Sequence, residues 1–87
     1  MEKLSGEEIG QVMGFYAIPS AALVEITHGS LKIGDKVWIK GRTTDLVETV
    51  LSMQIEYSSV SEVQQGSQVG IKVSSKVRRH DRVYKVS

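Results

Sequence analysis

Apolar and polar residues alternate along most of this 87-residue chain, and turn-forming residues interrupt the alternation at short intervals. Val37 and Ile39, for example, alternate with Lys36, Trp38 and Lys40. Because successive side chains of a strand point to opposite faces, this period of two predicts strands that are buried on one side. Strands are expected at residues 9–17, 22–26, 36–40, 46–56, 68–73 and 82–86, with a strand end or one helical turn at residues 60–65.

The breaks in the pattern indicate how these strands are arranged. Alternation is lost near Val50, which predicts a bulge, a common means of curving a strand. No segment keeps a 3.6-residue period, so almost no helix is expected. The sequence therefore predicts an all-β fold, a small six- to seven-stranded closed barrel, because closure removes exposed strand edges. We expect this single barrel domain at residues 9–87, after a flexible N-terminal segment at residues 1–8.

The composition excludes several chemistries. The chain has no cysteine, which excludes a disulfide framework, a thiolate zinc site and a thiol nucleophile. No apolar run approaches the roughly 18 residues that a membrane helix needs, and the N-terminus lacks the apolar core of a signal peptide. We therefore expect a soluble protein with no membrane association. A cytoplasmic location is expected by default, because the absence of cysteine fits a reducing compartment.

Two candidate motifs for nucleotide binding or catalysis are incomplete. Gly29 and Gly34 have the spacing of a phosphate-binding loop, but Asp35 occupies the lysine position and would repel phosphates. No nucleotide triphosphate is therefore expected as a ligand. His28 and His80 lie in predicted turns, and no serine or second ligand stands where it would complete a triad or a metal site. We expect no catalytic residue, no metal and no cofactor, and hence a binding domain rather than an enzyme.

The formal net charge of +1 conceals an uneven distribution. Residues 1–65 contain five basic and nine acidic side chains, a net charge of −4, whereas residues 66–87 contain six basic and one acidic, a net charge of +5. The six form a candidate basic edge that would attract a polyanion, or alternatively they are ordinary solvated surface. They are Lys72, Lys76, Arg78, Arg79, Arg82 and Lys85.

Residues 29–41 fit the pattern G-x-L-K-x-G-D-x-V-x-I. They resemble a strand–turn–strand motif in the second domain of translational GTPases, the family of elongation factor Tu and elongation factor G. Residues 50–54, 60–73 and 77–84 resemble later strands of that domain, in the same order. Residues 39–57, with the sequence IKGRTTDLVETVLSMQIEY, also resemble the barrel at the C-terminal end of collagenase-like peptidases.

The resemblance implies a Greek-key barrel of the translation-factor domain-two type, and another small Greek-key barrel with the same turns is the alternative. In the translation factors this barrel contacts ribosomal RNA or the end of a charged transfer RNA. The resemblance does not imply GTPase activity, because that family carries its phosphate loop in a preceding domain with no counterpart in these residues.

Two functions follow as hypotheses. The first is a binding domain associated with ribosomal RNA, transfer RNA or the ribosome, because basic side chains neutralise phosphates. The second is a protein-interaction module that docks on a separate GTPase or peptidase-like chain. Trp38 is its candidate anchor, since alternation turns this side chain away from Val37 and Ile39, although Trp38 could instead cover a barrel end. The RNA-binding candidates are Lys40, Arg42, Lys72, Lys76, Arg78, Arg79, Arg82 and Lys85.

Overall fold

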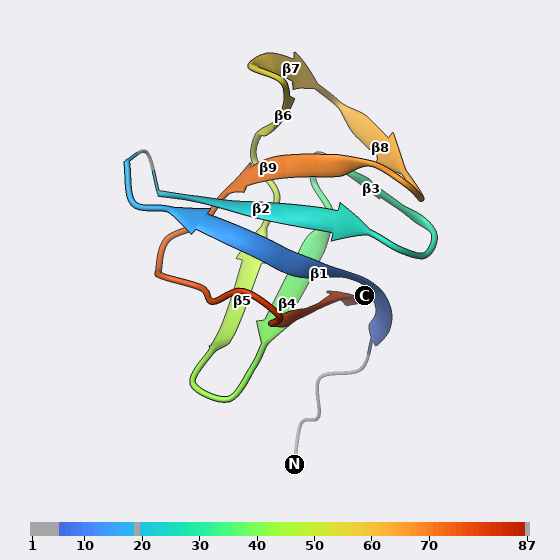
Figure 1. Ribbon diagram of the computed structural model, residues 1–87. Coiled ribbons are helices and arrows are strands. Elements are labelled where there is room, and N and C mark those ends of the chain that lie inside the picture. The colour runs from blue at the N-terminus through green and yellow to red at the C-terminus, as the bar shows by residue number, and fades with distance from the viewer. Residues whose placement is uncertain (1–5, 19, 87) are drawn as a thin grey trace.

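The computed structural model describes residues 6–18 and 20–86, which form ten β-strands and contain no helix (Figure 1). The all-β expectation is thus confirmed for this part of the chain. The strands are β1 (Gly6–Tyr16), β2 (Ala21–Ile26), β3 (Ser30–Lys32), β4 (Lys36–Lys40), β5 (Asp45–Thr49), β6 (Met53–Ile55), β7 (Ser58–Val60), β8 (Glu62–Gln64), β9 (Gln68–Lys72) and β10 (Arg82–Val86).

Eight of these strands form one antiparallel sheet in the order β5-β4-β10-β1-β2-β9-β6-β7, while β3 and β8 pair separately. In Figure 1, β4 and β5 run across the direction of β1, β2 and β9, so the two halves of the sheet turn toward each other. The edge strands β5 and β7 do not pair with each other. The closed Greek-key barrel that the sequence predicted is therefore not confirmed, because hydrogen bonding leaves the sheet open between these two strands.

The long strand β1 bends at two places where its register shifts. One shift lies between Glu8 and Gly10 in the pairing with β10, and the other lies between Val12 and Gly14 in the pairing with β2. At Gly10, strands β1 and β2 come so close that a Cβ atom on Gly10 would lie 2.1 Å from the carbonyl oxygen of Glu25. Such bulges increase the twist of a strand, which here carries the sheet from one half into the other.

A single hydrophobic core lies between the two halves. In β2, β4 and β9 the inward residues alternate with outward ones, as the sequence predicted, and Val37 and Ile39 are completely buried. Valine and isoleucine dominate this core because side chains branched at Cβ fit a pleated surface well. Its buried members are Ile9, Val12, Ala22, Val24, Ile26, Leu31, Val37, Ile39, Val50, Met53, Val63, Val69, Ile71, Val73, Val77 and Val83.

The segment predicted as one strand at residues 46–56 is two strands, β5 and β6, separated by residues 50–52. Val50 is buried between them; its N–H donates to the Asp35 carbonyl, and its own carbonyl accepts from the Gly34 N–H, both at 2.8 Å. The break in alternation thus marks a crossing between strands rather than a bulge within one. Residues 60–65 take the strand alternative, since β7 ends at Val60 and β8 occupies Glu62–Gln64.

The structure also places residues 6–8 in β1, where they pair with β10, rather than in a flexible N-terminal segment. Residues 1–5 of that predicted segment lie outside the described part of the chain. No helix long and apolar enough to cross a membrane occurs in the described residues.

Candidate interaction surfaces

Trp38 lies at the middle of β4, on the side of the sheet turned away from the core. Its neighbours across the sheet are Val47 of β5 and Tyr84 of β10. The Trp38 and Tyr84 rings stack at a tilt, with their centroids 5.3 Å apart and an angle of 37° between their planes. The Trp38 Nε1–H donates to Asp45 Oδ1 at 2.6 Å, which ties the indole of β4 to the neighbouring strand β5. We call Trp38, Val47 and Tyr84 the aromatic face.

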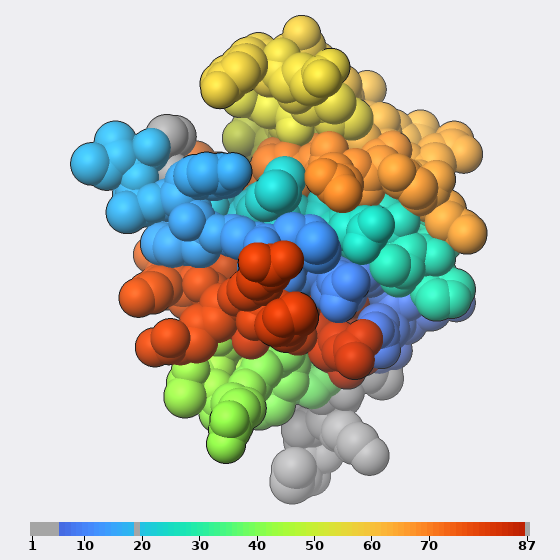
Figure 2. Space-filling view, in the orientation of Figure 1, coloured from blue at the N-terminus to red at the C-terminus, as the bar shows by residue number. Residues whose placement is uncertain are grey.

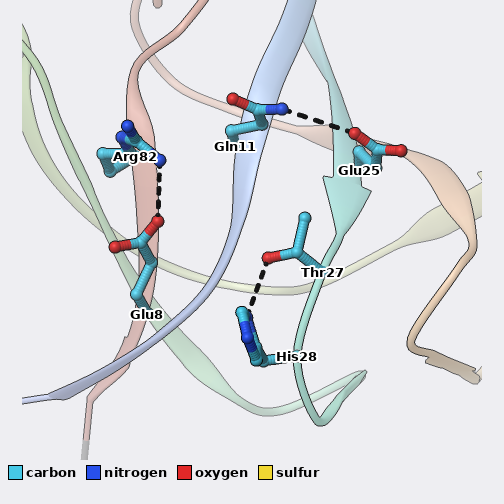
Figure 3. A network of polar contacts seen from close by, with 6 residues as sticks. All are labelled: Glu8, Gln11, Glu25, Thr27, His28 and Arg82. Carbon is cyan, nitrogen blue, oxygen red and sulfur yellow. Dashed lines mark hydrogen bonds and ion pairs between the residues drawn. The ribbon is translucent and has the colours of Figure 1, made fainter.

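Charged residues frame the aromatic face. Lys40 Nζ lies 3.6 Å from Asp45 Oδ2. Arg82 Nη1 donates to Glu8 Oε2 at 3.0 Å, a contact drawn in Figure 3. Both pairs are exposed, and pairs of this kind contribute at most about 1 kcal/mol. Two of the predicted RNA-binding cations, Lys40 and Arg82, are thus paired with carboxylates of the domain itself.

The predicted basic edge is only partly assembled. Lys85 Nζ lies 3.4 Å from Asp35 Oδ2, and Arg78 Nε donates to Thr43 Oγ1 at 2.9 Å. The Arg78 contact brings the β9–β10 loop against the β4–β5 loop, which carries Arg42; in Figure 2 these are the orange-red and green surfaces at lower left. Lys72 lies apart, at the end of β9. In the described residues, Arg42, Lys72, Lys76 and Arg79 have no ion-pair partner.

Asp81 is the one buried carboxylate among the described residues, with 5% of its surface exposed. Its Oδ2 accepts from the Arg78 backbone N–H at 2.9 Å, and its Oδ1 fills the space where a Cβ on Gly41 would stand. The main chain of this loop is tied to β1, because the His80 N–H donates to the Val12 carbonyl and the Val12 N–H donates to the Asp81 carbonyl. Asp81 therefore supports the loop, and the side chain of the exposed His80 does not pair with it.

The histidines are not brought into a common site. His28 Nδ1 lies 3.2 Å from Thr27 Oγ1 (Figure 3), an exposed contact between neighbours in sequence. In residues 6–18 and 20–86, no group of three or more histidine, aspartate or glutamate side chains is placed to hold a metal ion.

A groove that the sequence did not predict lies on the outer side of the half of the sheet formed by β2, β9 and β6. Its walls are the β1–β2 connection, with Tyr16 and Ile18, and the β6–β7 turn, with Tyr57; Gly70 of β9 forms the floor. The hollow between these walls has a volume of about 470 Å³. The sequence signal was weak, because these residues come from three separate segments, and only the apolar residues at two turn tips are unusual.

Comparison with known proteins clarifies what kind of domain this is. No protein-family model matches the sequence. A Methanocaldococcus jannaschii protein named "Uncharacterized protease" is 47% identical over 78 residues, which cover 88% of this chain and 19% of that protein. A Porphyromonas gingivalis protein named "Collagenase" is 31% identical over 78 residues, covering 88% of this chain and 22% of its own length. The chain thus spans about a fifth of the length of these relatives.

Solved structures also relate this domain to peptidases. The C-terminal domain of a Geobacillus thermoleovorans protein assigned to the U32 peptidases superposes with a TM-score of 0.84 at 18% identity, covering 91% of this chain and 99% of that one. The chain has the fold of a U32 peptidase C-terminal domain. The predicted likeness to the C-terminal barrel of collagenase-like peptidases is therefore supported. These similarities give no support to the resemblance to translational GTPases.

Proposed function

We propose that this chain is a non-catalytic accessory domain that docks on a peptidase-like catalytic chain. The observation that carries the proposal is the 47% identity along 88% of the chain to only a fifth of a protein named as a protease. The described residues bring together no group of histidine and carboxylate side chains that could hold a metal ion. A module of this kind contributes by binding, and its partner supplies the chemistry.

The aromatic face is the surface that we propose for docking. Tryptophan and tyrosine are the residues that most often anchor protein interfaces, because they bury a large area with few rotatable bonds. The tilted Trp38–Tyr84 stack and the Trp38–Asp45 hydrogen bond hold both rings in place before any partner binds. The neighbouring β5 is an edge strand of the sheet, so the same surface offers unpaired main-chain groups.

Docking can be tested with the Methanocaldococcus jannaschii relative from which the matching 78 residues have been deleted. We expect the 87-residue chain to bind this truncated protein in trans, measured by calorimetry. Trp38→Ala should weaken binding about tenfold, because it removes the anchor. Val47→Glu, an exposed edge-strand change that should not affect folding, is expected to act in the same direction.

The matched control is Leu51→Ala, which removes an exposed leucine that lies outside the aromatic face. It should leave the affinity unchanged. Absence of binding by the unaltered chain, or equal affinities for Val47→Glu and Leu51→Ala, would contradict docking through this surface.

Association with ribosomal or transfer RNA stays a prediction from the sequence. Three of its eight candidate cations, Lys40, Arg82 and Lys85, are paired with carboxylates of the domain. An electrophoretic mobility shift at two salt concentrations tests it, since phosphate contacts weaken steeply as salt rises.

A further inference from the structure

The groove on the β2–β9–β6 side lies apart from the aromatic face, with β1 between the two halves of the sheet. Two hollows make it up, of about 470 and 260 Å³, and they share Ala21, Gln54 and Gly70. Figure 2 shows its two walls projecting from the body of the molecule: the light-blue β1–β2 connection at upper left and the yellow β6–β7 turn at the top. Because they share these residues, the two hollows form one open groove, whose volume suits a short stretch of polypeptide.

Large apolar side chains gather at this groove although none of them is needed for the core. Of the six large hydrophobic residues that are exposed in the described part of the chain, three line it, namely Tyr16, Ile18 and Tyr57. Ile18 is 91% exposed and Tyr57 is 98% exposed, so neither packs against the domain. Exposed apolar clusters mark binding surfaces more often than scattered single residues do.

The backbone that presents Tyr57 is strained. Glu56 and Tyr57 form a two-residue turn between β6 and β7, and both have positive φ angles, 49° and 68°. Such turns strongly favour Asn-Gly, because residues with larger side chains pay a steric cost at positive φ. A tyrosine that is 98% exposed adds little to the core, and non-glycine residues held in this strained conformation cluster at binding sites.

The floor of the groove restricts how a ligand can bind. Gly70 lies in the middle of the sheet, paired with Leu23 on one side and Gln54 on the other. The main chain at the floor is thus already hydrogen-bonded within the sheet, so a ligand cannot add there as another strand. A polyproline II segment fits this surface, because its own main-chain groups remain in water and its ridges pack against aromatic side chains.

The two ends of the groove carry opposite charges. Lys72 lies at the end shared with Ser20 and Ser52, and Glu56 lies at the end beside Tyr57. The described residues give neither side chain an ion-pair partner. A complementary ligand carries an acidic group toward Lys72 and a basic group toward Glu56.

We propose that this groove binds an extended, proline-rich polypeptide segment in polyproline II conformation, with an acidic residue at one end and a basic residue at the other. Its apolar side chains pack against Tyr16, Ile18 and Tyr57, above Gly70, which has no side chain to obstruct it. Lys72 and Glu56 set its orientation through ion pairs with its charged ends. This binding does not depend on docking through the aromatic face.

The test uses the 87-residue chain and three fluorescent peptides, with affinities measured by anisotropy. The peptides share the core Pro-Leu-Pro-Leu-Pro and end in one glutamate and one lysine, in two glutamates, or in two lysines. We expect the mixed peptide to bind about threefold more tightly than the other two, since each exposed ion pair contributes modestly. Lys72→Glu should reverse this preference and favour the peptide with two lysines.

Gly70→Val separates binding from folding. A Cβ on Gly70 would meet nothing closer than the Gln54 carbonyl oxygen at 3.8 Å, so the fold should tolerate valine, which fills the floor of the groove. We expect at least about tenfold weaker binding of the mixed peptide with an unchanged unfolding transition. Leu51→Ala, outside the groove, is the control and should bind as the unaltered chain does.

The double change Glu56→Asn and Tyr57→Gly gives the most discriminating result. It installs the preferred turn residues, so we expect the melting temperature to rise by about 5 °C while the affinity for the mixed peptide falls. If none of the peptides binds, if Gly70→Val binds as well as the unaltered chain, or if Lys72→Glu leaves the preference unchanged, the proposal is wrong. Concentration-dependent dimerisation that Gly70→Val abolishes would show that a second copy of the chain occupies the groove instead.

Discussion

Replacing Gly10 by alanine is expected to cost about 3 kcal/mol of stability, a large part of what a domain of this size possesses. The reason is the close approach of β1 and β2 beside the bulge, where a Cβ would lie 2.1 Å from the Glu25 carbonyl oxygen and 3.1 Å from its carbonyl carbon. Both are main-chain atoms of a central strand, which cannot rotate away as the tip of a side chain would. Urea unfolding followed by Trp38 fluorescence measures the loss.

Gly14→Ala is the matched control, because Gly14 lies in the same strand at the other bulge and an added Cβ there meets nothing within 4 Å. Its stability should be unchanged or raised by about 0.5 kcal/mol, since alanine restricts the unfolded chain more than glycine does. Equal effects of the two substitutions would show that the contact between Gly10 and β2 does not limit the fold.

Asp81→Ala is expected to cost about 2 kcal/mol, because it removes a buried carboxylate and leaves the half-buried backbone N–H of Arg78 without its acceptor. It also empties the space beside Gly41 and loosens the loop that Arg78 joins to Thr43. Thermal or urea unfolding measures the change, and limited proteolysis of residues 74–81 should show the loop becoming accessible.

Two further variants identify the cause of that loss. Asp81→Asn retains a side-chain oxygen at the same place and should lose less stability than Asp81→Ala. Thr43→Ala removes only the exposed hydrogen bond with Arg78 and should cost no more than about 0.5 kcal/mol. If Asp81→Ala proved as mild as Thr43→Ala, the carboxylate would not be the support that its burial indicates.

The sequence predicted the individual strands well because alternation is a local property. The expected segments 22–26, 36–40 and 82–86 match β2, β4 and β10 to within one residue. Strand order is not local: whether β5 and β7 meet depends on the path of residues 50–52 and on the bulges of β1, and the sequence pattern specifies neither.

For the candidate sites, too, the sequence predicted local features but not contacts between distant segments. The alternation correctly predicted that Trp38 points away from the core. Its partners, Tyr84 and Asp45, are known only from the pairing of β4 with β10 and with β5. The basic edge was defined by neighbours in sequence, yet Lys85 lies against Asp35, fifty residues earlier in the chain. The sequence analysis did not predict the groove for two reasons. The turn at Glu56 and Tyr57 contains neither asparagine nor glycine, and the floor lies at Gly70, which has no side chain to signal it.

The pairing of β1 with β10 has a consequence for how the domain is made. Gly6 lies opposite Val86, so strands from the two ends of the described chain must meet before the centre of the sheet is complete. Contacts this distant in sequence slow folding, to the millisecond-to-second range that is typical of non-local β topologies. During synthesis β2 can pair with β1 early, whereas the other side of β1 stays unpaired until residues 82–86 have been made, so β1 is a transiently exposed strand edge.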